Sequence, residues 1–226
     1  MLFRSIALLL NMDVDWQLIK AIMPFWDPSY RCFTFNKEDM IPTIEEYSFM
    51  LRIEPRNVDK VLWKKVKSAG FKKKLSQLMQ VEEAVVEKNI RKKGKSECFA
   101  WDFFKRYITK NYGEDRVVDV FALAIYGLVI FPKVPGHVEV AVIDVIEQIS
   151  SQANSVPAIV AETFRTLNFC RRSENGDLVC CIQMLYVWIR SHFWGTNPTS
   201  LKFYMGDFSP ITQFCKMVWP KNQSRA

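Results

Sequence analysis

The stretch RCFTFNKEDMIPTIEEYSFML (residues 31–51) carries, in one short span, the signals of a strand, a loop and a helix. The segment RCFTF at its start is aromatic and β-branched, which predicts a brief strand. Further on, Ile44, Tyr47 and Leu51 recur at the spacing of one helix face. Thr43 stands immediately before this pattern, so we expect a helix that begins there.

The same stretch holds four carboxylates, which could be an acid/base or metal site or the start of a helix. Thr43-x-x-Glu46 has the spacing of a capping box, in which the Thr43 hydroxyl accepts from the Glu46 N–H and the Glu46 carboxylate accepts from the Thr43 N–H. Glu45 and Glu46 also face the positive end of the helix dipole. Glu38 and Asp39 are expected in a solvated loop. No histidine or further acid completes a site, so we interpret all four carboxylates as structural.

Working outward from this stretch, most of the chain has helical periodicity. The segments concerned are 14–23, 57–95, 98–111, 114–133, 137–150, 156–172 and 174–194, with one more helix opening at Ser209-Pro210. We therefore predict a mainly α fold, a compact multi-helix domain with one or two short strands near residues 31–36.

The first residues, MLFRSIALLLNMDVD, imitate a signal peptide, but the apolar run is short and no cleavage-site pattern follows. We expect a core helix there instead. The longest apolar stretch, VFALAIYGLVIF (120–131), has twelve residues, whereas a membrane span needs about 20. We expect a buried helix at 120–131, no membrane association and an intracellular protein.

The positive charge of the chain is concentrated in one segment. The whole chain has a net charge of +7, and residues 60–95 carry twelve Lys and Arg against three Glu, so the remainder has a net charge of −2. We expect residues 57–96 to form a basic helical excursion from the core that contacts nucleic acid. The alternative is a solvated lysine face that only keeps the protein soluble. The candidate contacts are Lys64, Lys65, Lys67, Lys72, Lys73, Lys74, Arg91, Lys92, Lys93 and Lys95.

Sequence motifs for metal binding or catalysis are missing. The six cysteines form no CxxC pair, and His137 and His192 lie near no cysteine pair, so a zinc site of standard spacing is not expected. Cys180 and Cys181 fall within an apolar helical pattern, where we expect buried, reduced thiols. No nucleophile motif accompanies either histidine. We therefore predict no enzyme activity, no cofactor and no metal.

Four blocks of the sequence together resemble a known plant family. They are FWDPSYRCFTFNKEDMIPTIEEY (25–47), RVVDVFALAIYGLVIFPK (116–133), VPAIVAETFRTLNFCRR (156–172) and WIRSHFW (188–194). They look like the uncharacterised, high-copy plant domain related to the plant mobile domain, which occurs in transposon-derived reading frames. The resemblance implies one helical domain over residues 1–226, in a copy truncated at both ends, and it supplies no catalytic or binding residue.

Two function hypotheses follow. The first is a non-enzymatic, transposon-derived domain that contacts nucleic acid through residues 60–95, in the nucleus rather than the cytoplasm. By analogy with the family, it would serve transposon silencing or genome maintenance. The second is a protein-interaction or assembly module with no nucleic-acid binding. An enzyme of unknown type is the third and weakest alternative.

Overall fold

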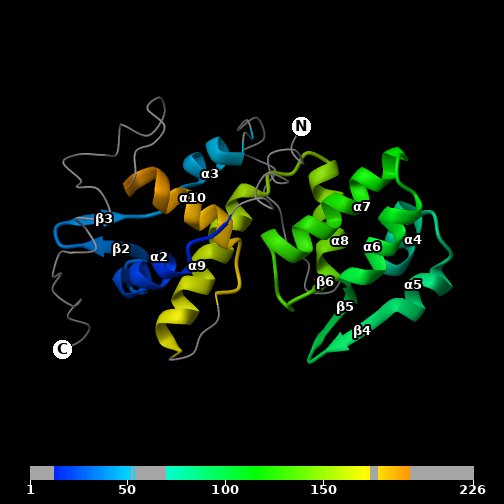
Figure 1. Ribbon diagram of the computed structural model, residues 1–226, viewed down its shortest axis with the longest axis horizontal. Helices are drawn as coiled ribbons and strands as arrows, with labels where there is room; N and C mark the ends of the chain where they lie inside the picture. The colour runs from blue at the N-terminus through cyan, green and yellow to red at the C-terminus, as the bar shows by residue number, and fades with distance from the viewer. Residues whose placement is uncertain (1–12, 52, 54–69, 174–177, 194–226) are drawn as a thin grey trace.

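Two lobes of secondary structure lie side by side in the molecule (Figure 1). The structure is a computed structural model that describes residues 13–51, 53, 70–173 and 178–193. The first lobe is built from residues 16–51 and 156–193, and the second from the intervening residues 71–150. The fold is mainly helical, as predicted.

The first lobe combines helices with a small sheet. Its elements are α2 (Trp16–Ile22), the 3-10 turn η1 (Met23–Phe25), β1 (Trp26–Asp27), β2 (Cys32–Phe35), β3 (Glu38–Met40), α3 (Ile44–Leu51), α9 (Val156–Arg172) and α10 (Ile182–Phe193). The strands are antiparallel in the order β1-β2-β3. The predicted capping box starts α3, because the Glu46 N–H donates to Thr43 Oγ1 at 3.2 Å and the Thr43 N–H donates to Glu46 Oε2 at 2.9 Å.

Aromatic side chains fill the core of the first lobe. Trp26 and Phe33 are paired on β1 and β2, with ring centroids 5.0 Å apart, and Phe33 stacks on Trp188 of α10 at 5.8 Å. Helix α9 is fastened to β1 by two hydrogen bonds. The Trp26 indole donates to Asn168 Oδ1 at 2.9 Å, and Arg171 Nε donates to the Trp26 carbonyl at 2.9 Å. Residues 168 and 171 of α9 thus pack onto β1, more than 100 positions earlier in the sequence.

The second lobe wraps helices around a second antiparallel sheet of order β4-β5-β6. Its elements are α4 (Phe71–Met79), α5 (Glu83–Asn89), β4 (Ile90–Lys93), β5 (Ser96–Ala100), α6 (Trp101–Lys110), α7 (Asp115–Ile125), the π-helix η2 (Tyr126–Ile130), β6 (His137–Glu139) and α8 (Ala141–Ser150). The predicted buried stretch 120–131 forms the end of α7 and η2, and most of it is buried. A Cβ atom at Gly127 would lie 2.5 Å from Val138 Cγ1, so glycine lets η2 approach β6 closely.

The strands are more numerous than predicted, and three of them replace parts of predicted helices. Residues 90–93 form β4, residues 96–100 form β5 and residues 137–139 form β6. These short segments gain their ladder of hydrogen bonds only from one another, and local periodicity does not report such pairing. In the first lobe, Glu38 and Asp39 belong to β3 rather than to a loop, and both are exposed.

Several predictions lie outside the described residues. They concern the core helix expected at the start of the chain, the first part of the predicted helical segment 57–95, up to residue 69, and the helix opening at Ser209-Pro210. In the part of the chain that is described, no helix has both the length and the apolar character needed to cross a membrane.

Candidate functional site

The predicted basic residues divide into three groups in the structure. Lys64, Lys65 and Lys67 lie outside the described residues. Lys72, Lys73 and Lys74 lie in the first turns of α4. Arg91, Lys92 and Lys93 lie on β4, and Lys95 follows in the turn to β5. The described part of the predicted segment is thus partly strand, and Leu75, Met79 and Val86 anchor it in the core.

Two of the α4 lysines are occupied by ion pairs within the fold. Lys72 Nζ lies 2.6 Å from Glu87 Oε1 on α5. Lys74 Nζ lies 2.7 Å from Asp144 Oδ1 and 2.5 Å from Glu147 Oε2, both on α8. Hydrogen bonds to these carboxylates raise the pKa of both lysines. Lys74 therefore joins α4 to α8 and is a structural residue.

The cations of β4 and its turn are arranged differently. We call β4, the turn 94–95 and β5 the basic hairpin; Figure 1 shows it as an extended ribbon at the edge of the second lobe. Arg91, Lys92, Lys93 and Lys95 are all exposed, and none forms an ion pair within the described residues. Gly94, with φ of +59°, lets the chain reverse between Lys93 and Ser96.

The tip of the basic hairpin is a two-stranded ribbon. Strand β6 pairs with β5 at Cys98, Phe99 and Ala100, and the Val140 N–H after β6 donates to the Glu97 carbonyl, so residues 92–96 extend beyond the third strand. One acid faces this group of cations from the partner strand, since Glu97 lies opposite Lys92 in the register. The Arg91 guanidinium donates to the backbone carbonyls of Lys88 and Ile90 at 3.3 and 3.2 Å, which holds it over the start of the strand.

A buried polar network in the first lobe was missed by the sequence analysis. Glu46 was predicted to cap α3, and it does, but its carboxylate also meets α10. Oε2 accepts from Trp188 Nε1 at 2.9 Å, and Oε1 lies 3.0 Å from His192 Nε2. The Glu46 and His192 side chains are 7% and 3% exposed. The histidine that a carboxylate site requires is therefore present, although it lies far away in the sequence.

The polar side chains of this network have their hydrogen-bond partners within the protein. Burial by itself raises the pKa of the Glu46 carboxyl, but hydrogen bonds from His192, Thr43 and Trp188 outweigh burial and hold that pKa below its ordinary value. His192 Nδ1 lies 2.8 Å from the Trp188 carbonyl, so both ring nitrogens face acceptors. The geometry fits a buried clamp between α3 and α10, since both side chains have their partners inside the fold.

The other chemistry-bearing residues do not form a site in the described part of the chain. Cys180 and Cys181 immediately precede α10 instead of lying within a helix, and both are buried; burial raises the pKa of the Cys181 thiol to about 12. His137 lies on β6, with Nδ1 2.9 Å from the Pro135 carbonyl. The described residues include no cluster of three or more potential metal ligands.

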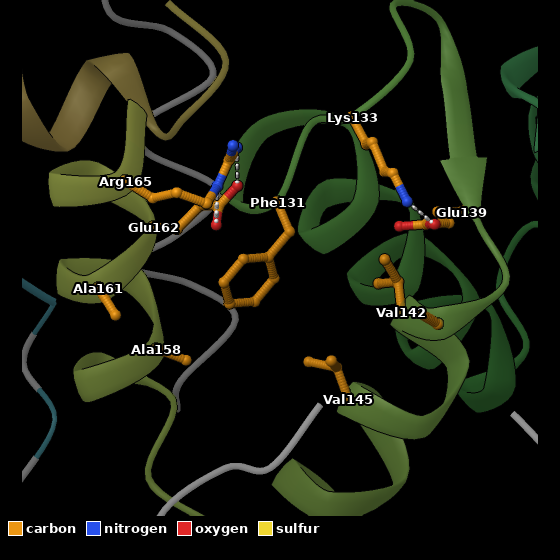
Figure 2. Close-up of a pocket in the computed structure, with 10 residues that line it drawn as sticks. Phe131, Lys133, Glu139, Val142, Val145, Ala158, Ala161, Glu162 and Arg165 are labelled. Carbon is orange, nitrogen blue, oxygen red and sulfur yellow. Dashed lines mark hydrogen bonds and ion pairs between the residues drawn. The ribbon is translucent and has the colours of Figure 1, made fainter. Parts of the chain in front are cut away.

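A cavity of about 540 Å³ lies between the lobes. The second lobe supplies its walls from β6, α8 and the segment after η2, and the first lobe supplies one face of α9 (Figure 2). Phe131, Val142 and Val145 face Ala158 and Ala161 across the space. No sequence signal marks this cavity, because its walls come from distant segments.

These features define a class of protein: a two-lobed, mainly helical domain with a projecting basic hairpin and a cavity between the lobes. The chain belongs to the family described as Domain of unknown function (DUF7745), whose model matches residues 2–218. No curated protein and no solved structure matches it.

Proposed function

We propose that this domain acts by contacting macromolecules rather than by catalysis, and that it binds nucleic acid through the basic hairpin. One observation carries the proposal: Arg91, Lys92, Lys93 and Lys95 are all exposed on one ribbon tip and form no ion pair within the described residues. Cations that are not neutralised by the protein are available to phosphates, and each contact releases counterions from the nucleic acid.

The shape of the hairpin supports duplex DNA as the ligand. The major groove of B-DNA admits a two-stranded β-ribbon. Residues 92–96 form such a ribbon beyond the edge of β6. Phosphate contacts from lysines would set the position of the ribbon without reading sequence, so we expect binding of many sequences with similar affinity.

Ion pairs within the fold remove two lysines from the set of candidate nucleic-acid contacts. Lys72 and Lys74 already bond to carboxylates of α5 and α8, so binding phosphate would require them to break those pairs. The interface we propose is therefore smaller than the one predicted from the sequence. Within the described residues it consists of Lys73 and the four cations of the hairpin tip.

Fluorescence anisotropy with a generic duplex DNA, measured across a salt series, tests the proposal. Five phosphate contacts, from Lys73 and the four hairpin cations, predict a slope of log K against log salt concentration of roughly −4 to −5. The test variant is Arg91→Gln, Lys92→Gln, Lys93→Gln and Lys95→Gln combined. The matched control removes four exposed cations elsewhere, by changing Lys20, Lys105, Arg106 and Lys110 to Gln. Equal losses in the two variants would contradict binding by the hairpin, since they would indicate a response to net charge alone.

We further propose that the domain derives from a plant mobile element and works in the nucleus, in transposon silencing or genome maintenance. This part rests on the resemblance of the blocks at 25–47, 116–133, 156–172 and 188–194 to the plant domain related to the plant mobile domain. A fluorescent fusion expressed in plant cells tests the location, and exclusion of the fusion from nuclei would contradict it.

A second candidate function is a protein-interaction module without nucleic-acid binding. Large apolar side chains remain exposed on α7, where Val118 and Phe121 lie on one face at i, i+3 spacing. Sedimentation velocity across a concentration series tests self-assembly. A monomer at every concentration, together with salt-dependent DNA binding, would favour the first function over the second.

A further inference from the structure

The cavity between the lobes has the dimensions of a small-molecule site. Its volume of about 540 Å³ falls within the range of roughly 300–1,000 Å³ that ligand pockets occupy. Small side chains create the space, since Ala158 and Ala161 lie one turn apart on the face of α9 that is turned toward the cavity. Phe131, Val142 and Val145 provide an apolar surface opposite them (Figure 2).

Two ion pairs border the cavity, one on each lobe. On the second lobe Lys133 pairs with Glu139, and on the first lobe Arg165 Nη2 lies 2.6 Å from Glu162 Oε1. Figure 2 shows both carboxylates directed toward the space around Phe131. The cavity therefore combines an apolar body with a charged group on each of two facing walls.

The carboxylates of these pairs are more enclosed than the cations. The Glu139 and Glu162 side chains are 12% and 27% exposed, whereas those of Lys133 and Arg165 are 49% and 57% exposed. The Lys133 ammonium can turn into water at little cost, because a surface ion pair contributes little to stability. The Arg165 guanidinium is held more firmly, since its Nε and Nη2 atoms donate to both oxygens of Glu162 at 2.9 and 2.6 Å. Once the Lys133 ammonium has turned into water, the less exposed Glu139 carboxylate presents its negative charge to the cavity.

We propose that this cavity binds a small organic cation, a molecule with an aromatic or aliphatic body and a protonated amine. The body would pack against Phe131, Val142 and Val145. The ammonium group would donate to Glu139, taking the place of the Lys133 ammonium that now bonds to that carboxylate. This site is separate from the basic hairpin and does not depend on the proposed nucleic-acid binding.

Because the two walls belong to different lobes, ligand binding would also hold the lobes together. A ligand that binds only the folded protein raises its thermal stability by mass action. Ligand binding in the cavity can thus be measured directly and also as an increase in the Tm of the protein. The two readouts come from the whole chain and require no activity assay.

The test uses phenethylamine and tryptamine as cationic probes at millimolar concentration, with 3-phenylpropionate and 2-phenylethanol as the anionic and neutral controls. Saturation-transfer NMR and thermal denaturation detect binding. We expect the two amines to bind and to raise Tm, and the acid and the alcohol to bind at least tenfold more weakly. Stronger binding of the acid, or no binding of either amine, would overturn the proposal.

Variants then place the amines in the cavity. Ala161→Leu fills the space at an exposed helix position where leucine is well tolerated, and Glu139→Gln removes the carboxylate charge that would accept from the ammonium group. Each should weaken amine binding at least tenfold. The matched control is Ala84→Leu, at an exposed position of α5 outside the cavity, which should bind like the wild type. If Ala161→Leu lowers Tm strongly in the absence of probe, Glu139→Gln alone provides the test, and unchanged affinity in that variant would contradict the site.

Discussion

The Nε2 atom of His192 lies 3.0 Å from Oε1 of Glu46, and both side chains are buried. The contact joins the first turn of α3 to the last turn of α10. The same carboxylate accepts hydrogen bonds from the Thr43 N–H and the Trp188 indole. A residue that begins a helix locally therefore also fixes how two distant helices pack.

Replacing Glu46 by leucine should destabilise the protein strongly. The change leaves the Trp188 indole and the His192 ring without their acceptor in a buried site, and removing one partner of a buried pair costs about 3–5 kcal/mol. Glu46→Gln should cost less, because its amide oxygen can still accept from Trp188 and its amide nitrogen can donate to a neutral His192 ring. Urea denaturation measures both changes.

The matched control for this prediction is Glu45→Leu. Glu45 occupies the same first turn of α3 but is exposed, so its loss should cost about 0.3–1 kcal/mol through the helix dipole alone. Similar losses for Glu45→Leu and Glu46→Leu would show that the network contributes nothing beyond helix capping.

Stability should depend on pH through the same carboxylate. The folded pKa of Glu46 lies below its ordinary value of 4.5, which it regains on unfolding. The unfolded state therefore binds the proton more readily. The stabilisation is complete above pH 4.5 and is lost as pH falls through the folded pKa.

Unfolding free energies measured between pH 7 and pH 3 should fall more steeply for the wild type than for Glu46→Gln, which has no charge to lose at this position. The difference between the two proteins should shrink below pH 4.5. Parallel curves over the whole range would contradict the lowered pKa.

Lys74 and Lys73 should behave in opposite ways although they are neighbours on α4. Lys74→Gln removes the cation that bonds to the buried Asp144, whose Oδ2 atom already has no hydrogen-bond partner. Leaving a buried acceptor unsatisfied costs about 1–3 kcal/mol. Lys73 is exposed and forms no ion pair within the described residues, so Lys73→Gln should change stability by less than about 0.5 kcal/mol. Thermal denaturation of both variants at low salt compares their stabilities. Equal shifts in Tm would refute the structural role of Lys74.

Alanine at position 127 should destabilise the second lobe. A Cβ atom there would lie 2.5 Å from Val138 Cγ1, and overpacking of this kind costs about 1–3 kcal/mol. Val138→Ala removes the clashing methyl groups, so the double variant should be more stable than the sum of the single changes predicts. Chemical denaturation of the four proteins gives the coupling energy. Strict additivity would mean that η2 shifts away from β6 at no cost.

Local signals were read correctly from the sequence where neighbouring residues determine the structure. The capping box at Thr43 and Glu46 and the helix over 156–172 depend on contacts within a few residues. The strand at 90–93 was missed because Ile-Arg-Lys-Lys has no apolar alternation and pairs only through β5. Its conformation is imposed by tertiary structure.

The candidate sites show the same contrast between what neighbouring residues determine and what only tertiary contacts determine. The basic residues were visible in the sequence, but the sequence could not show that Lys72 and Lys74 are used in ion pairs while the hairpin cations are not. The link between Glu46 and α10 spans 142 positions at its Trp188 contact, and the cavity joins α8 to α9 across two lobes. Such relationships arise only when distant segments meet.

The most direct test of the central claim is the salt dependence of duplex DNA binding by the wild type and by the variant in which Arg91, Lys92, Lys93 and Lys95 are changed to Gln. The account predicts a slope of roughly −4 to −5 for the wild type and of about −1 for the variant, which keeps Lys73. An unchanged slope in a folded variant, or no binding by the folded wild type at low salt, would contradict it.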